Sequence, residues 1–153
     1  MQRRLFLQAS ITVTQSLILV AAGMLKPRNL IGEWRADIFD AASLADAMQR
    51  LTGALPVHKT DAITLELPAI VEDGRSVQVR VRSMLPGTEV ITLLSEKNPN
   101  PVVGTFQLEP EMTPAIDTRI KMGGSGSVIA LVRADGGFFS TQRRAKVTAG
   151  GCG

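Results

Sequence analysis

The strongest constraint on the fold is the alternation of apolar and polar residues in 77–82, which read VQVRVR. Three valines at 77, 79 and 81 alternate with Gln78, Arg80 and Arg82. Successive side chains of a strand point to opposite faces, so this segment is predicted to bury its valines and expose its polar side chains. Runs of similar length, separated by Gly, Pro, Asn and Asp, continue almost to the end of the chain. This pattern is typical of an antiparallel sandwich.

The predicted strands and turns follow one another closely. The strands are 63–67, 77–82, 90–94, 102–108, 116–122, 128–132 and 138–147. The turns are 72–74, 86–87, 98–101, 123–126 and 135–137. We therefore predict a mainly β domain over residues 39–149, an immunoglobulin-like antiparallel β-sandwich of about seven strands. The cysteine pair of antibody domains is missing, since the chain has one cysteine.

One helix is predicted in front of the strands, after a linker at 23–38. Its apolar residues recur at helical spacing: Ala41, Leu44, Ala45, Met48 and Leu51. Asp40 is expected to cap it, and Gly53 and Pro56 to end it. We expect Trp34 and Phe39 to seat the helix, which should pack on the sheet rather than bind a partner.

The N-terminus has the features of a twin-arginine export signal over residues 1–22. A moderately apolar stretch, interrupted by polar residues, is too short for a typical membrane-spanning helix. It follows the signal residues Arg3, Arg4, Phe6 and Leu7. Cleavage is expected after Ala22 or the next residue, which predicts a periplasmic protein free of the membrane. An uncleaved anchor is the alternative.

Charge and composition argue against nucleic-acid binding. Removal of Arg3 and Arg4 with the signal would lower the formal net charge of the chain from +3 to +1. The remaining positive residues are scattered, and aromatic residues make up only 4% of the chain. A nucleic-acid surface would need a basic stripe with interleaved aromatic residues.

The sequence lacks a conventional catalytic or metal site. The one histidine, His58, is expected to be a solvated residue in a polar connector, so no triad can be assembled. The glycines at 123–126 are predicted to form a flexible hairpin turn, because no Lys-Ser/Thr follows them as in a phosphate-binding loop. Glu109, Glu111 and Asp117 do not have metal-ligand spacing. We therefore predict no metal and no cofactor.

The last four residues contain the single cysteine. Cys152 lies among Gly150, Gly151 and Gly153, which give its sulfur neither a packing partner nor a fixed direction. An extended arm from Thr148 could carry the sulfur roughly 15 Å from the domain. We interpret Cys152 as an exposed nucleophile on a flexible tether, able to enter the cleft of another protein.

Several motifs together resemble the family of the Y subunit of the Sox sulfur carrier. They are the terminal GGCG after the 145–148 strand, the NPNP loop at 98–101 leading into VGTF at 103–106, and ITLELP at 63–68. The twin-arginine leader also matches. The tail has one glycine fewer than the family's usual Gly-Gly-Cys-Gly-Gly.

The resemblance implies a periplasmic covalent carrier rather than an enzyme, paired with a β-sandwich Z subunit. It implies that Cys152 is the attachment site, on which a c-type cytochrome enzyme conjugates thiosulfate. A hydrolase then releases sulfate, and a sulfane dehydrogenase oxidises the sulfur that remains. Two other interpretations stay open: an exported interaction module whose cysteine forms an intermolecular disulfide, and a related carrier of another exported oxidation pathway.

Overall fold

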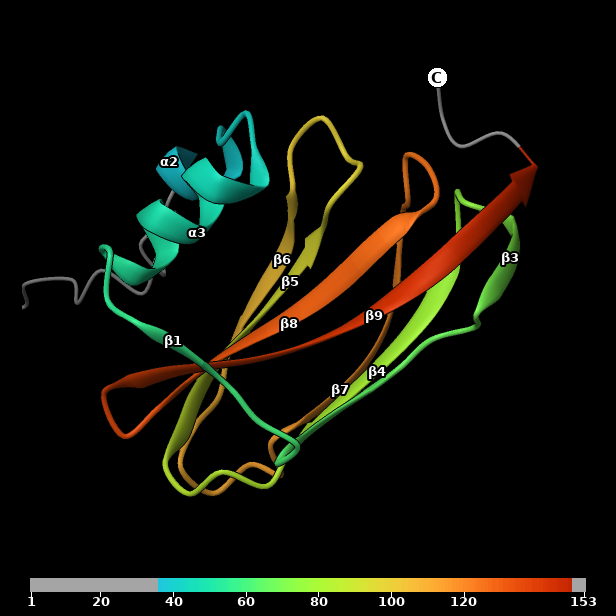
Figure 1. Ribbon diagram of the computed structural model, residues 1–153. Coiled ribbons are helices and arrows are strands. Elements are labelled where there is room, and N and C mark those ends of the chain that lie inside the picture. The colour runs from blue at the N-terminus through green and yellow to red at the C-terminus, as the bar shows by residue number, and fades with distance from the viewer. Residues whose placement is uncertain (1–35, 150–153) are drawn as a thin grey trace, which may run out of the picture. The chain divides into compact units, whose positions relative to one another are not determined.

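The computed structural model describes residues 36–149, which form a mainly β domain (Figure 1). The predicted signal, the linker up to residue 35 and the arm at 150–153 lie outside this range. The helices of the described region are α2 (Ala36–Phe39) and α3 (Leu44–Thr52). Its strands are β1 (Val57–Lys59), β2 (Ile63–Glu66), β3 (Ile70–Asp73), β4 (Val77–Ser83), β5 (Thr88–Ser95), β6 (Val102–Gln107), β7 (Ala115–Ile120), β8 (Gly126–Ala134) and β9 (Gly137–Ala149).

The strands form two sheets, which confirms the predicted β-sandwich. The larger sheet has the order β1-β9-β8-β5-β6, with β3 also paired to β9, and the smaller has the order β2-β4-β7. The described region has nine strands where the sequence predicted about seven. The additional strands, β1 and β3, are short, and both pair with β9 in parallel. The antiparallel pattern predicted for all strands is therefore incomplete.

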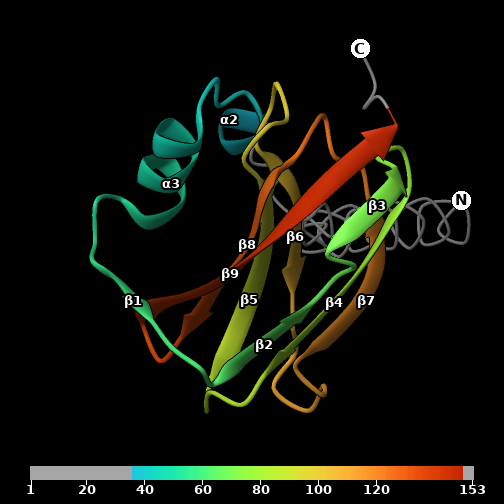
Figure 2. The same cartoon turned by 45° about the vertical axis from the view of Figure 1, so that its right-hand side comes forward.

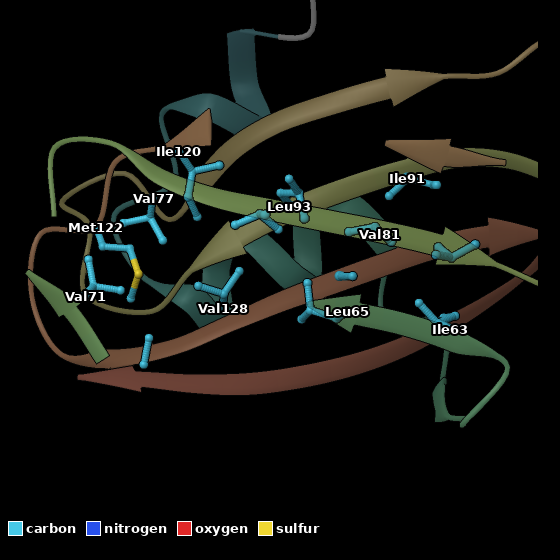
Figure 3. Packing of buried hydrophobic residues seen from close by; sticks show 14 of the residues in the cluster. Ile63, Leu65, Val71, Val77, Val81, Ile91, Leu93, Ile120, Met122 and Val128 are labelled. Atoms are coloured by element: carbon cyan, nitrogen blue, oxygen red, sulfur yellow. The ribbon is translucent and has the colours of Figure 1, made fainter. Parts of the chain in front are cut away.

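The main core lies between the two sheets (Figure 3). The valines of β4 point inward and its polar residues outward, as their alternation predicts. The central strands β5 and β8 are buried on both faces over 91–95 and 128–132, and these stretches are accordingly rich in apolar residues. Leu93 faces the smaller sheet, whereas Leu94 faces the opposite side.

The helices cover the face of the larger sheet that lies away from the smaller sheet (Figures 1 and 2). Ala47 of α3 belongs to one buried cluster with Leu94 and Ile129, and Phe39 packs against this cluster as predicted. Trp34 lies outside the described residues.

The predicted start of the helix was wrong. Ser43, not Asp40, is the N-cap: its Oγ accepts a hydrogen bond of 3.1 Å from the backbone N–H of Asp46. Asp40 instead ends a separate short turn of helix, α2, which includes the last residues of the predicted linker. Gly53 ends α3 as predicted, with a φ of 61° and an N–H that donates to the carbonyl of Gln49. None of the helices in the described part of the chain has the length and hydropathy to cross a membrane.

Candidate functional site

The residues predicted to carry the chemistry lie outside the described part of the chain. These are Cys152 with its flanking Gly150, Gly151 and Gly153, and the signal residues Arg3, Arg4, Phe6 and Leu7. The predicted arm begins directly after Ala149, the last residue of β9. The structure shows how the end of β9 is held in the domain.

The end of β9 is held on one edge by β3 (Figure 2). Lys146 donates its backbone N–H to the carbonyl of Ala69 at 2.9 Å, and the Thr148 hydroxyl donates to the carbonyl of Val71 at 3.3 Å. Val71 is buried in the main core, and Val147 packs against that core. The strand is thus fixed up to the residues next to the predicted arm.

On its other edge, the end of β9 extends beyond the strand it pairs with. β8 begins at Gly126, which lies opposite Ala145. Beyond this point the side chain of Ser125 contacts β9: its Oγ accepts a hydrogen bond from the Val147 N–H at 2.9 Å and lies 3.3 Å from the Val147 carbonyl oxygen. Ser125 therefore acts as a clamp that prolongs the hydrogen bonding of β9 toward the arm.

The turn that carries Ser125 is itself braced by the loop between β5 and β6. Asn98 Oδ1 accepts from the Gly123 N–H at 2.7 Å, and Asn98 Nδ2 donates to the carbonyl of Lys121 at 2.9 Å. The Ser95 hydroxyl donates to Asn98 Oδ1 at 3.1 Å. Asn98 thus links the 98–101 loop, part of the resemblance to the carrier family, to the turn that carries Ser125.

The sequence predicted a hairpin turn at 123–126, and this prediction was wrong. These residues connect β7 of the smaller sheet with β8 of the larger sheet. A Cβ on Gly123 would lie 2.7 Å from the carbonyl oxygen of Lys97, and one on Gly126 would lie 2.7 Å from Lys97 Cγ. Gly123 thus allows two backbones to approach closely, and Gly126 leaves room for the Lys97 side chain.

Charged side chains surround this end of the sandwich. Arg75 forms an ion pair of 2.9 Å with Asp73, which lies beside Ala149 in the β3–β9 register. The Arg75 side chain, followed by its backbone N–H, lowers the pKa of Asp73 from its ordinary value. Hydrogen bonding from the Ser127 N–H, with help from Lys97, likewise lowers the pKa of Glu96. Both carboxylates are therefore ionised at neutral pH.

The other residues considered as catalytic candidates lie apart from the end of β9. His58 belongs to β1 rather than to a connector, where it is exposed and its ring lies 6.0 Å from that of Phe139. Asp117 pairs with Arg80 on the outer face of the smaller sheet, and Glu109 and Glu111 are exposed in the β6–β7 loop. Within residues 36–149, no three His, Cys, Asp or Glu residues are grouped as metal ligands would be.

Sequence reasoning missed β3, Ser125 and Asn98 as parts of the site. The apolar pair Ile70-Val71 after Pro68 was a signal for β3, although four residues with mixed polarity make a weak one. Nothing in the sequence marks Ser125, because its role depends on β9 reaching beyond the start of β8.

Together, the fold and the site define a helix-covered β-sandwich whose long last strand is clamped just before a cysteine-bearing terminus. The family described as "Sulfur oxidation protein SoxY" matches residues 48–152, a range that includes Cys152. The chain belongs to the SoxY family.

A similar solved structure is the sulfur carrier protein SoxY from Chlorobium limicola f thiosulfatophilum. The two share 32% identity with a TM-score of 0.64, covering 74% of this chain and 99% of the Chlorobium chain. Superoxide reductase (neelaredoxin) from Ignicoccus hospitalis is also similar, with 20% identity, a TM-score of 0.53 and coverage of 60% of this chain and 95% of that one. This second likeness shows the fold alone. Among curated proteins, no match was found.

Proposed function

We propose that this protein is a sulfur carrier that holds thiosulfate-derived sulfur on Cys152 and presents it to partner enzymes. The observation that carries the proposal is the match to the SoxY family through Cys152. The similar Chlorobium protein is described as a sulfur carrier. The clamped end of β9 supports the same role, because a carrier arm needs a fixed starting point and a terminal reactive group.

The chemistry rests on the thiol of Cys152. A free thiol has a pKa of about 8.5, so only a small fraction is thiolate at neutral pH, and the partner's active site would have to promote ionisation. Conjugation joins the cysteine sulfur to the outer sulfur of thiosulfate, with the proton released and an electron pair passed to a c-type cytochrome. The product is a cysteine S-thiosulfonate.

Later steps release sulfate and regenerate the thiol. Water attacks the terminal sulfonate, which leaves as sulfate, and the cysteine persulfide remains. A sulfane dehydrogenase would oxidise the outer sulfur to a sulfonate, with oxygen from water and the electrons passed to its acceptor. A second hydrolysis then frees Cys152. In this scheme the partner enzymes supply the catalysis. The carrier itself needs no cofactor and holds only the covalent adduct on Cys152.

The proposal includes a compartment and a constant partner. The twin-arginine motif at Arg3 and Arg4 supports export to the periplasm. A SoxZ-like β-sandwich subunit would form the carrier complex, with the cytochrome enzyme, the hydrolase and the dehydrogenase as transient partners.

Replacement of the thiol tests the proposal. Cys152→Ala and the near-isosteric Cys152→Ser should both abolish thiosulfate-dependent loading, measured as radiolabelled sulfur bound to the carrier. Thermal unfolding should be unchanged in both variants, since the core lies between strands that end at Ala149. Normal loading of either variant would contradict the proposal.

A further inference from the structure

Two cations with no described partner lie close to the arm on β9: Arg144 and Lys146, here called the basic stem patch. Both are exposed, and neither forms a hydrogen bond or ion pair through its side chain within residues 36–149. Most other arginines of this region do have partners; Arg50, Arg80 and Arg133, for example, pair with carboxylates at 2.7–2.9 Å. Among the described residues, therefore, no paired carboxylate neutralises the charge of the basic stem patch.

The patch lies where one edge of β9 changes from a stretch with no paired strand among the described residues to its pairing with β3. β1 pairs with β9 as far as Ser140, and β3 pairs with it only from Lys146 onward. Arg144 and Lys146 are two residues apart and share one face of the strand, where they line a hollow with Ala69 and Ser125. None of the described residues that line this hollow is a carboxylate.

The patch is also close to the arm. Lys146 precedes Ala149 by three residues, a distance of about 10 Å along an extended strand. A protein that takes the arm into its active site must therefore bring the rim of that site against this part of β9. A cationic surface placed there would attract an acidic rim and raise the association rate.

We infer that the basic stem patch is an electrostatic docking surface for an acidic protein surface around the active-site entrance of an enzyme that processes the arm. The inference rests on the proposed carrier function. The patch guides the approach of the two proteins, and the chemistry stays with Cys152 and the partner's active site. Exposed charges act mainly on the association rate, so the effect should appear in kcat/KM and fall as salt rises.

The experiment compares two double charge reversals in the full carrier complex. Arg144→Glu/Lys146→Glu alters the patch, and Lys59→Glu/Arg82→Glu is the matched control with the same change in net charge. Lys59 and Arg82 are exposed and have no described side-chain partner either. Lys59 lies opposite Ser140, about 30 Å along β9 from Ala149. Arg82 lies near the end of β4, which runs away from the arm.

The measurement is sulfate release from the thiosulfonate-loaded carrier by the purified hydrolase, at about 0.02 M and about 0.5 M NaCl. At low salt, the patch variant should lose about tenfold or more in kcat/KM with kcat unchanged, while the control stays within about twofold. At high salt, the patch variant should approach the wild type. Iodoacetamide, a neutral reagent, should alkylate Cys152 at the same rate in all three proteins.

Four results would overturn the inference. Equal losses in the patch and control variants would show an effect of net charge alone. A loss of kcat/KM that persists at high salt, or a loss confined to kcat, would show that the cations act on the chemical step or on the stability of the domain. In either case they would not act on association. A wild-type carrier that never loads sulfur would overturn the proposed function, and the inference with it. A loaded wild type with an unaffected patch variant would overturn the inference alone.

Discussion

Ser125→Ala should loosen the end of β9 without unfolding the sandwich. The substitution removes the Oγ that accepts from the Val147 N–H at 2.9 Å and lies 3.3 Å from the Val147 carbonyl oxygen. A neutral hydrogen bond contributes about 0.5–1.5 kcal/mol net, and water can replace an exposed one. We therefore expect a loss of about 1 kcal/mol in local stability, which makes opening of this segment about fivefold more frequent.

Native-state hydrogen exchange measures this opening residue by residue. The Val147 amide should exchange about fivefold faster in Ser125→Ala, following the local loss of about 1 kcal/mol. Amides of β5 should be unchanged. Ser76→Ala is the matched control, because the Ser76 hydroxyl accepts from Arg119 of β7 at 3.2 Å. Unchanged protection of Val147, or equal acceleration in β5, would refute the clamp.

Two further predictions concern the turn and the outer face of the smaller sheet. Gly123→Ala should cost about 1–3 kcal/mol because its Cβ would meet a Lys97 backbone oxygen at 2.7 Å, whereas Gly124→Ala, 3.8 Å from Lys97 Cβ, should be nearly neutral in chemical denaturation. Equal losses would refute the close-approach argument. The Arg80 side chain, with Gln78, lowers the pKa of Asp117 from 3.8. The stability that this pair contributes is present above the ordinary pKa and is lost as pH falls through the lowered one. Arg80→Gln should thus be less stable than the wild type at pH 7 and match it near pH 2; a constant difference would contradict this.

The alternation of apolar and polar residues in β4 helped to predict a sandwich, because a strand that is buried on only one face has apolar residues at every second position. The helix was predicted from the helical spacing of its apolar residues, although its start was misplaced. Ser43 and Asp40 are both good caps, and the choice between them depends on how α2 packs.

The strands β1 and β3 could not be predicted with the same reasoning. Each has three or four residues and is held in place by β9, a strand far along the chain. Their order in the sheet is a tertiary property. The same holds for Gly123 and Gly126, which the sequence suggested were part of a flexible turn but which lie in close contact with Lys97.

The sequence predicted the reactive residue of the candidate site but not the residues that hold the end of β9. Cys152 could be singled out because it is the one thiol of the chain and lies among glycines. The clamp formed by Ser125 depends on where β8 begins relative to β9, which no local pattern records.

The central claim is that Cys152 carries thiosulfate-derived sulfur, and intact mass spectrometry tests it most directly. The protein, purified with its partner subunit, is incubated with thiosulfate, the conjugating enzyme and an oxidised electron acceptor, then analysed with and without reductant. Thiosulfonate or persulfide adducts, located on Cys152 by fragmentation and removed by reductant, are the predicted result. An unmodified thiol, or only a reducible dimer, would contradict the claim and favour an exported interaction module.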